Sequence, residues 1–134
     1  MTKLTELSQR IGKILVIWGI ASIIAGIGLL LVYSLTLLRG IGVQAIIWGV
    51  IDAVIAAYIL FKQKQESVEK IAKTVSTNIY FDIIFQIVGL IVIIAYYPNL
   101  YMVGNGIGVV IQGFFLFILD RTYHNSLRKL EKVP

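Results

Sequence analysis

Three aspartates lie in long apolar stretches of this chain, where acidic side chains are unusual. Asp52 lies near the middle of one apolar run, Asp82 lies near the start of another, and Asp120 ends a third. An ionised acid in the centre of a bilayer costs about 3 kcal/mol on insertion scales, so such residues face the protein interior and by default suggest a functional site. Through these acids the chain could bind a proton or a cation.

Amide side chains accompany the acids at helical spacing. Asn78, Asp82 and Gln86 follow one another at four-residue steps, which places them along one side of a helix. Gln112 lies about half-way along the next apolar run, at the depth that the helical rise gives for Gln86. We therefore expect Gln112 to meet Gln86 inside the protein.

The expected depths of the acids differ. Asp82 and Asp120 should lie near one membrane boundary, beside Arg121 and His124, whereas Asp52 is about eleven residues from either end of its run, near the bilayer centre. No basic residue lies at the depth of Asp52. Two interpretations are open: the acids form an ion site, or they form neutral hydrogen bonds that fix helix order. The partners expected for Asp52 are Tyr58, Gln44, Gln86 and Gln112.

The elements that must position these residues are membrane-spanning helices. Hydrophobic residues make up 58% and charged residues 14% of the 134 residues, which is more apolar than a soluble domain of this size could bury. There is no cysteine, so disulfides and thiol chemistry are excluded. The net charge of +5 comes from basic residues at the ends of apolar runs, as membrane topology requires, and no nucleic-acid partner is expected.

Four apolar runs approach or exceed the length of about 20 residues that spans the hydrocarbon. They cover about residues 14–38, 41–61, 79–97 and 104–120. A short interfacial helix is expected before the first run, and the polar segment before the third carries an apolar face at helical spacing. The prediction is an all-α, polytopic membrane four-helix bundle, one domain over residues 1–134. Its two antiparallel hairpins are joined by a cytoplasmic amphipathic helix.

The basic residues predict the orientation. Of the twelve lysines and arginines, all but Arg39 fall in the N-terminal segment, the central polar segment or the C-terminal tail. The positive-inside rule then places both termini in the cytoplasm, in a multi-pass protein of the cell membrane. Tyrosines collect at the opposite ends of the runs, as an aromatic belt would: Tyr33, Tyr96, Tyr97 and Tyr101.

Small residues recur on one face of three of the runs. Membrane helices associate through close backbone approach, so these residues are expected to serve helix packing, and the first two faces should meet in an antiparallel pair. The residues are Gly12, just before the first run, with Gly19 and Gly26 in it, then Ala45, Gly49, Ala53 and Ala57 in the second, and Gly104 and Gly108 in the fourth.

Two sets of matching residues suggest a duplicated hairpin. Both hairpins would then share one orientation, and Asp52 would be required at a depth similar to that of Asp120. At an offset of 68, Gly40, Gln44 and Asp52 match Gly108, Gln112 and Asp120. At an offset of 63, Trp18, Gly19 and Gly26 match Phe81, Asp82 and Gly89.

The second half of the chain resembles a group of uncharacterised four-span prokaryotic membrane proteins. Residues 78–124 carry the resemblance, as Asn78-x3-Asp82-x6-Gly89, Gly106-x-Gly108 and Gln112-Gly113-x-Phe115-Leu116-x3-Asp120. The resemblance implies a four-span fold and brings no activity with it.

An enzyme is not expected, and neither is a cofactor or a metal site. His124 is the single histidine, and no nucleophile or phosphate-binding loop accompanies the acids. The first hypothesis is a non-enzymatic integral membrane scaffold or accessory subunit, which associates in the lipid bilayer with other membrane subunits or with itself as an oligomer. The alternative is a proton- or cation-coupled small transporter or channel that uses Asp52 and the pair of Asp82 and Asp120.

Overall fold

A computed structural model describes residues 3–32, 35–61 and 67–131 of the chain. Four α-helices make up almost all of this part: α1 (Lys3–Val32), α2 (Thr36–Phe61), α3 (Val68–Tyr96) and α4 (Leu100–Glu131). All four are long and apolar enough to cross a membrane. The described residues contain no strand, so the all-α class is confirmed.

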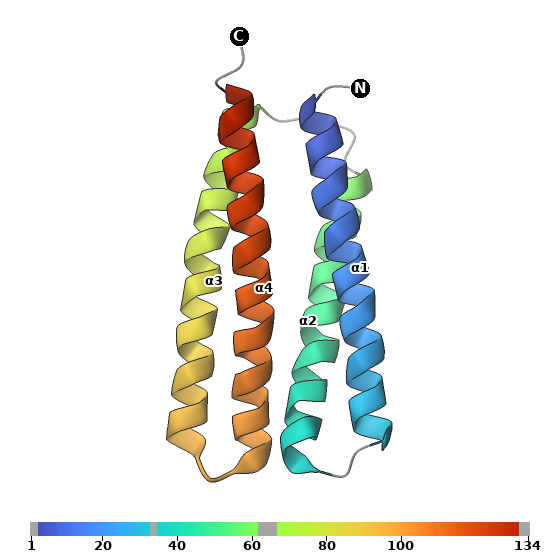
Figure 1. Ribbon diagram of the computed structural model, residues 1–134, viewed down its shortest axis with the longest axis vertical. Helices are drawn as coiled ribbons and strands as arrows, with labels where there is room; N and C mark the ends of the chain where they lie inside the picture. The colour runs from blue at the N-terminus through green and yellow to red at the C-terminus, as the bar shows by residue number, and fades with distance from the viewer. Residues whose placement is uncertain (1–2, 33–34, 62–66, 132–134) are drawn as a thin grey trace.

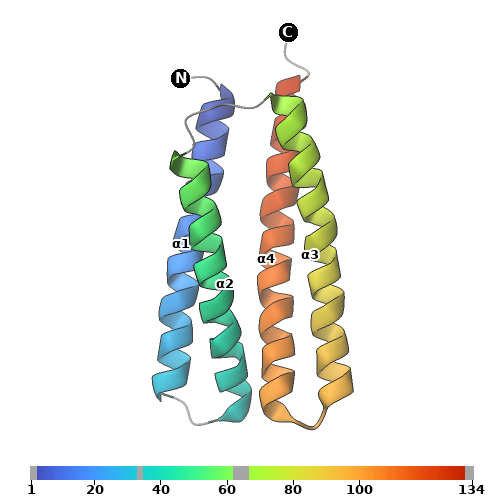
Figure 2. The ribbon, with the colours of Figure 1, turned by 180° about the vertical axis from the view of Figure 1, so that it is seen from behind.

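The helices form two antiparallel hairpins that stand side by side (Figure 1). Helices α1 and α2 make the first hairpin, α3 and α4 make the second, and the contact of α2 with α4 joins them. The beginning of α1 and the end of α4 lie at one end of the bundle, which we call the terminal end (Figure 2). The opposite end, where α1 gives way to α2 and α3 to α4, is the loop end.

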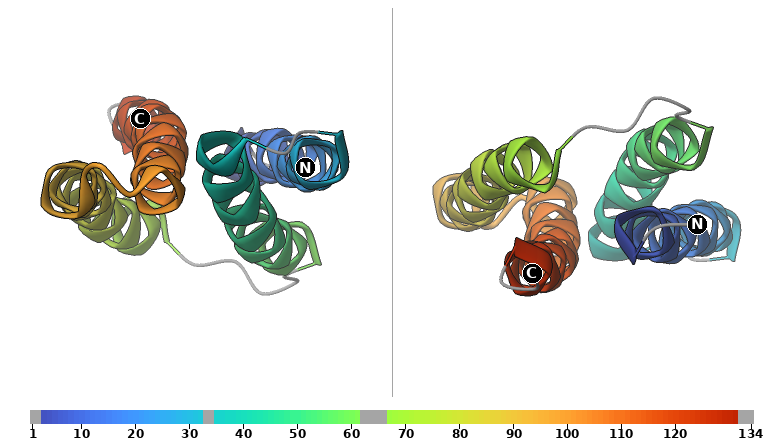
Figure 3. Two further views of the ribbon diagram at one scale, coloured as in Figure 1. Left: turned by 90° about the horizontal axis from the view of Figure 1, so that it is seen from below. Right: turned by 90° about the horizontal axis from the view of Figure 1, so that it is seen from above.

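The two hairpins diverge along the bundle. Seen along its axis, α2 lies beside α4 at the loop end and moves away from it toward the terminal end (Figure 3). At the loop end the two backbones approach closely, since a Cβ built at Gly40 would lie 2.7 Å from the amide nitrogen of Asn105. At the terminal end, a buried apolar cluster from all four helices holds the bundle together instead: Ile11, Leu15, Ala56, Ala72, Val75, Leu119, Tyr123 and Leu127.

The polar segment before the third apolar run is helical, but it is not a separate helix. Residues 68–78 are the first turns of α3. Ser67 caps the start of this helix, and its side chain accepts a hydrogen bond of 3.2 Å from the Lys70 amide. No glycine or proline interrupts residues 68–88, and the buried side chains of Ala72 and Val75 continue the packed face. The expectation of a separate connecting helix is therefore corrected, and residues 62–66 lie outside the described part.

The limits of two further helices differ from the expected ones. Helix α1 already begins at Lys3 and ends at Val32, not at Leu38. The guanidinium of Arg39 donates a hydrogen bond of 2.8 Å to the carbonyl oxygen of Leu30, which satisfies one end of α1. Helix α4 continues past Asp120 to Glu131. The predicted turn at Pro98 and Asn99 is confirmed, and the Asn99 side chain accepts from the Met102 amide at 3.2 Å.

The two hairpins share one helix register. In the first, a Cβ at Gly19 would lie 2.8 Å from the carbonyl oxygen of Gly49, and one at Gly26 would lie 2.6 Å from that of Gly42. In the second, a Cβ at Gly89 would lie 2.8 Å from the Gly106 carbonyl oxygen, and one at Gly113 would lie 3.4 Å from that of Asp82. Each contact of the first hairpin matches one of the second hairpin. The residue numbers differ by 63 between α1 and α3, and by 64 between α2 and α4.

The repeat in the structure therefore has the expected offset of 63 between α1 and α3, but it does not have the expected offset of 68 between α2 and α4. Helix α2 carries Gly40-x-Gly42-x6-Gly49 and α4 carries Gly104-x-Gly106-x6-Gly113. The offset of 68 is one helical turn too long, because the backbone contacts of the hairpins fix the register. Asp120 then corresponds to Ala56 and not to Asp52.

Candidate functional site

The three aspartates lie inside the bundle, within electrostatic reach of one another. Asp52 of α2 is fully buried, Asp82 of α3 is 4% exposed and Asp120 of α4 is half-buried. The carboxyl groups of Asp82 and Asp120 lie within hydrogen-bonding reach of each other, and both interact electrostatically with Asp52. We call these three residues the acid cluster.

Helix geometry explains why the acids meet although their expected depths differ. Gly40 lies beside Gly104, and α2 and α4 run in the same direction, so Asp120 lies about one turn beyond the level of Asp52. Side chains on a helix tilt toward its N-terminus, and α3 runs antiparallel to α4, so the side chains of Asp82 and Asp120 lean toward each other. The structure thus brings all three acids within electrostatic reach of one another.

The acid cluster has unused hydrogen-bonding capacity. Both carboxyl oxygens of Asp52 and Oδ2 of Asp82 are buried and have no hydrogen-bond partner among the described residues. A hydrogen bond between two carboxyl groups requires a proton on one of them, because an ionised carboxylate only accepts. The cluster can therefore hold a proton between Asp82 and Asp120 and has free acceptors at Asp52.

None of the four partners expected for Asp52 hydrogen-bonds to it. Gln44 donates to the side-chain oxygen of Asn105 at 2.8 Å and accepts from the indole of Trp48 at 3.0 Å. Asn105 in turn donates to the carbonyl oxygen of Tyr101 at 2.9 Å. Gln44 therefore links α2 to α4 in the loop half of the bundle, away from the acids.

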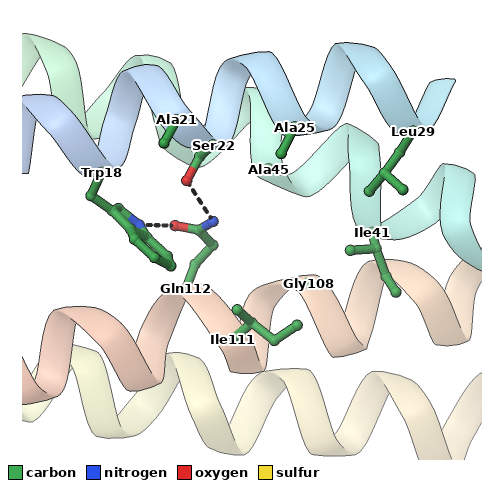
Figure 4. Close-up of a pocket in the computed structure, with 10 residues that line it drawn as sticks. All are labelled: Trp18, Ala21, Ser22, Ala25, Leu29, Ile41, Ala45, Gly108, Ile111 and Gln112. Carbon is green, nitrogen blue, oxygen red and sulfur yellow. Dashed lines mark hydrogen bonds between the residues drawn. The ribbon is translucent and has the colours of Figure 1, made fainter. Parts of the chain in front are cut away.

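Gln112 bridges the two hairpins and does not meet Gln86. It accepts a hydrogen bond from the Trp18 indole at 2.8 Å and donates to the Ser22 hydroxyl at 3.3 Å, both on α1 (Figure 4). Gln86 lies instead against the backbone of α4, where a Cβ at Gly113 would come within 3.2 Å of its Cγ. The Trp18 ring stacks on Phe115 with centroids 3.9 Å apart.

The sequence-based prediction did not include the side chains that hydrogen-bond to Gln112 and Gln44. Trp18 and Ser22 lie four residues apart, so they share one face of α1, and Asn105 lies one residue from the predicted packing position Gly104. A search for polar side chains at one-turn spacing on α1 would have found the first two.

A cavity of about 330 Å³ lies at the terminal end of the bundle. Its walls come from all four helices, and its polar side chains are all neutral: Thr5, Ser8, Gln9, Tyr58, Thr74, Asn78 and Tyr123. Asn78 is one turn from Asp82 on the same face of α3, and Ile55 and Tyr123 are three residues from Asp52 and Asp120. The cavity therefore ends about one helical turn, roughly 5 Å, from the acids. We call it the terminal cavity.

A second cavity, of about 280 Å³, lies on the loop side of Trp18 and Gln112 (Figure 4). Apart from Trp18, Ser22 and Gln112, it is lined by aliphatic side chains and Gly108. Its polar side chains are already hydrogen-bonded to one another, so it offers little to a charged ligand.

Within residues 3–32, 35–61 and 67–131, no group of three or more His, Cys, Asp or Glu side chains could hold a metal ion. The carboxyl groups of the acid cluster can bind and transfer protons.

The predicted packing residues lie mostly at helix contacts. Gly19, Gly26, Gly49 and Ala53 lie between α1 and α2, where a Cβ at Gly19 would be 3.0 Å from the Ala53 amide nitrogen. A Cβ at Gly12 would meet the Leu60 side chain at 2.9 Å. Gly104 and Gly108 lie against α2, beside Leu37 and Gln44. Ala45 is buried, and Ala57 is half-buried.

The fold and the buried polar groups define a class, the small all-α bundle with four potential membrane-spanning helices and polar side chains inside. Within that class the chain belongs to a family of unknown function, DUF6992, whose model matches residues 14–121. The matched range includes all three acids. No curated protein and no solved structure matches the chain. The site geometry must therefore carry the functional argument.

Proposed function

We propose that the protein is a multi-pass membrane protein that binds and passes protons through the acid cluster, as a proton-coupled transporter or channel for a small solute. The unpartnered, fully buried carboxyl of Asp52, within electrostatic reach of two further acids, carries this proposal. A buried acid that serves only helix order would hydrogen-bond a neighbouring helix, as Gln44 and Gln112 do.

The orientation follows from the basic residues at the terminal end. The positive-inside rule places both termini and the first turns of α3 in the cytoplasm. The terminal cavity then faces the cytoplasm, and its neutral polar side chains can support water that carries protons to the carboxyl groups of Asp82 and Asp120. Asp52 then accepts a proton from one of these carboxyl groups.

In our proposal, the loop half of the bundle limits the passage of protons. Gly40 and Gly104 bring α2 and α4 into backbone contact there, and Gln112 and Trp18 link α4 to α1. In our proposal this arrangement is open to the cytoplasm and closed to the opposite side, and a shift of one hairpin against the other gives the acids access to that side.

A scaffold or accessory subunit is the second candidate function. The close glycine contacts within each hairpin favour it, because they make a rigid element suited to holding partners. Purification of a stoichiometric complex from the native membrane, together with an Asp52→Asn variant of unchanged phenotype, would favour the scaffold.

Proton flux into reconstituted vesicles tests the proposed function. A potassium gradient with valinomycin imposes an inside-negative potential, and a pH-sensitive dye inside the vesicles reports proton entry. Asp52→Asn keeps the shape of the side chain but removes the titratable group, and we expect it to reduce the flux at least about tenfold, as the loss of a proton-transfer group typically does.

The control variant is Glu69→Gln, which removes an exposed acid in the first turn of α3. It should conduct protons like the unmodified protein, and both variants should have unchanged helical circular dichroism. Equal flux through Asp52→Asn and the unmodified protein would eliminate the proposed role of Asp52.

A further inference from the structure

A basic hollow lies between α3 and α4 at the terminal end, separate from the terminal cavity. It has a volume of about 340 Å³, and Ala72, Lys73, Ser76, Thr77, His124 and Arg128 line it. Lys73 comes from α3 and Arg128 from α4, and no acidic side chain is part of the lining. The hollow therefore has the charge of an anion site contributed by two helices.

The neutral side chains of the hollow fit an oxyanion. The Ser76 hydroxyl and the His124 imidazole can donate hydrogen bonds. The Thr77 hydroxyl already donates to the Lys73 carbonyl oxygen at 3.2 Å, so it does not add a donor. An arginine can bind two oxygens of a phosphate at once, and a lysine adds a compact positive charge.

The depth of the hollow favours a lipid over a soluble anion. Its α3 residues precede Ile79, the predicted start of the third span, by two to seven positions, and its α4 residues follow Asp120 by four to eight. At about 1.5 Å per residue, these positions lie about 3–12 Å beyond the hydrocarbon, in the headgroup layer of a bilayer.

We propose that this basic hollow binds the phosphate group of an anionic phospholipid from the cytoplasmic leaflet. Arg128 and Lys73 hold the phosphate, and the acyl chains lie along the exposed apolar faces of α3 and α4. Basic pockets between membrane helices on the cytoplasmic side are suited to such headgroups. The proposal rests on the membrane placement proposed above and does not depend on proton transport.

Native mass spectrometry of the purified protein in detergent tests the lipid site. The protein is mixed with phosphatidylglycerol, with phosphatidylcholine of the same acyl chains, or with inorganic phosphate. We expect one retained phosphatidylglycerol per chain and much less phosphatidylcholine. Arg128→Gln and Lys73→Gln should each weaken retention about tenfold or more, because each removes a charged hydrogen-bond donor.

The matched controls are Lys129→Gln and Lys70→Gln, which remove an exposed charge from the same helices outside the hollow. Both should retain phosphatidylglycerol as the unmodified protein does. Equal loss in the control variants, or equal retention of the two lipids, would overturn the proposal. Displacement of the lipid by millimolar inorganic phosphate would assign the hollow to a soluble anion and overturn the lipid assignment. Unchanged circular dichroism confirms that each variant folds.

Discussion

Asp52 is the residue whose environment is least explained by helix packing. Its side chain is fully buried, and both of its oxygens lack a hydrogen-bond partner among the described residues. Burial of an unsatisfied acceptor costs about 1–3 kcal/mol. In the proposed function this cost is the consequence of keeping an acceptor available for a transferred proton.

Gln112 differs from Asp52, because both the oxygen and the nitrogen of its side-chain amide form hydrogen bonds. We predict that Gln112→Leu destabilises the protein by about 1–2 kcal/mol, through loss of the bonds to Trp18 and Ser22. Unfolding in mixed micelles, followed by tryptophan fluorescence, measures this change. Gln86→Leu is the control and should cost less, and a larger loss for Gln86→Leu would contradict the assigned contact.

Residue identities were easier to predict than residue contacts. Charge and hydropathy identified Asp52, Asp82, Asp120 and Gln112 as interior polar residues. Their contacts depend on how far each helix is shifted along its neighbours, and counting from uncertain span ends gave an error of one or more turns. Gln112 therefore meets α1, and Asp120 interacts electrostatically with Asp52.

Helices α2 and α4 provide most of the contact between the two hairpins. Their contact at the loop end depends on glycine, since a Cβ at Gly104 would overlap the carbonyl group of Leu37. The periodicity of small residues indicated close packing of α1 with α2. It did not predict that Gly104 and Gly108 lie against α2.

Enlarging one of these glycines tests the α2–α4 contact. We predict that Gly104→Leu lowers the free energy of unfolding by about 1–3 kcal/mol, because the added atoms force the backbones apart. Gly28→Leu is the control, since a Cβ at Gly28 has no atom within 4 Å. Unfolding in mixed micelles measures both variants. Similar stabilities of the two variants would show that this contact does not support the fold.

One end of the molecule is rich in lysine and arginine, and the other end has almost none. This asymmetry was readable from the sequence, because topology depends on composition and not on helix register. The limits of α3 and α4 were less predictable, because both helices continue several turns beyond their apolar runs.

Single cysteines can test the orientation, because the chain has no cysteine of its own. We predict that a membrane-impermeant maleimide labels Asn99→Cys in intact cells. Glu69→Cys should react only after the membrane is permeabilised. The reverse pattern would place the terminal end outside the cell and contradict the proposed cytoplasmic entry to the acid cluster.

The central claim is that the acid cluster holds a proton between carboxyl groups inside the bundle. Infrared difference spectroscopy of the reconstituted protein at neutral pH measures this directly, because a protonated carboxyl has a carbonyl band that a carboxylate lacks. We predict such a band in the unmodified protein and its loss or shift in Asp120→Asn and Asp82→Asn, with no change in Glu69→Gln. A spectrum without a protonated carboxyl band, or a band unaffected by either substitution, would contradict the account.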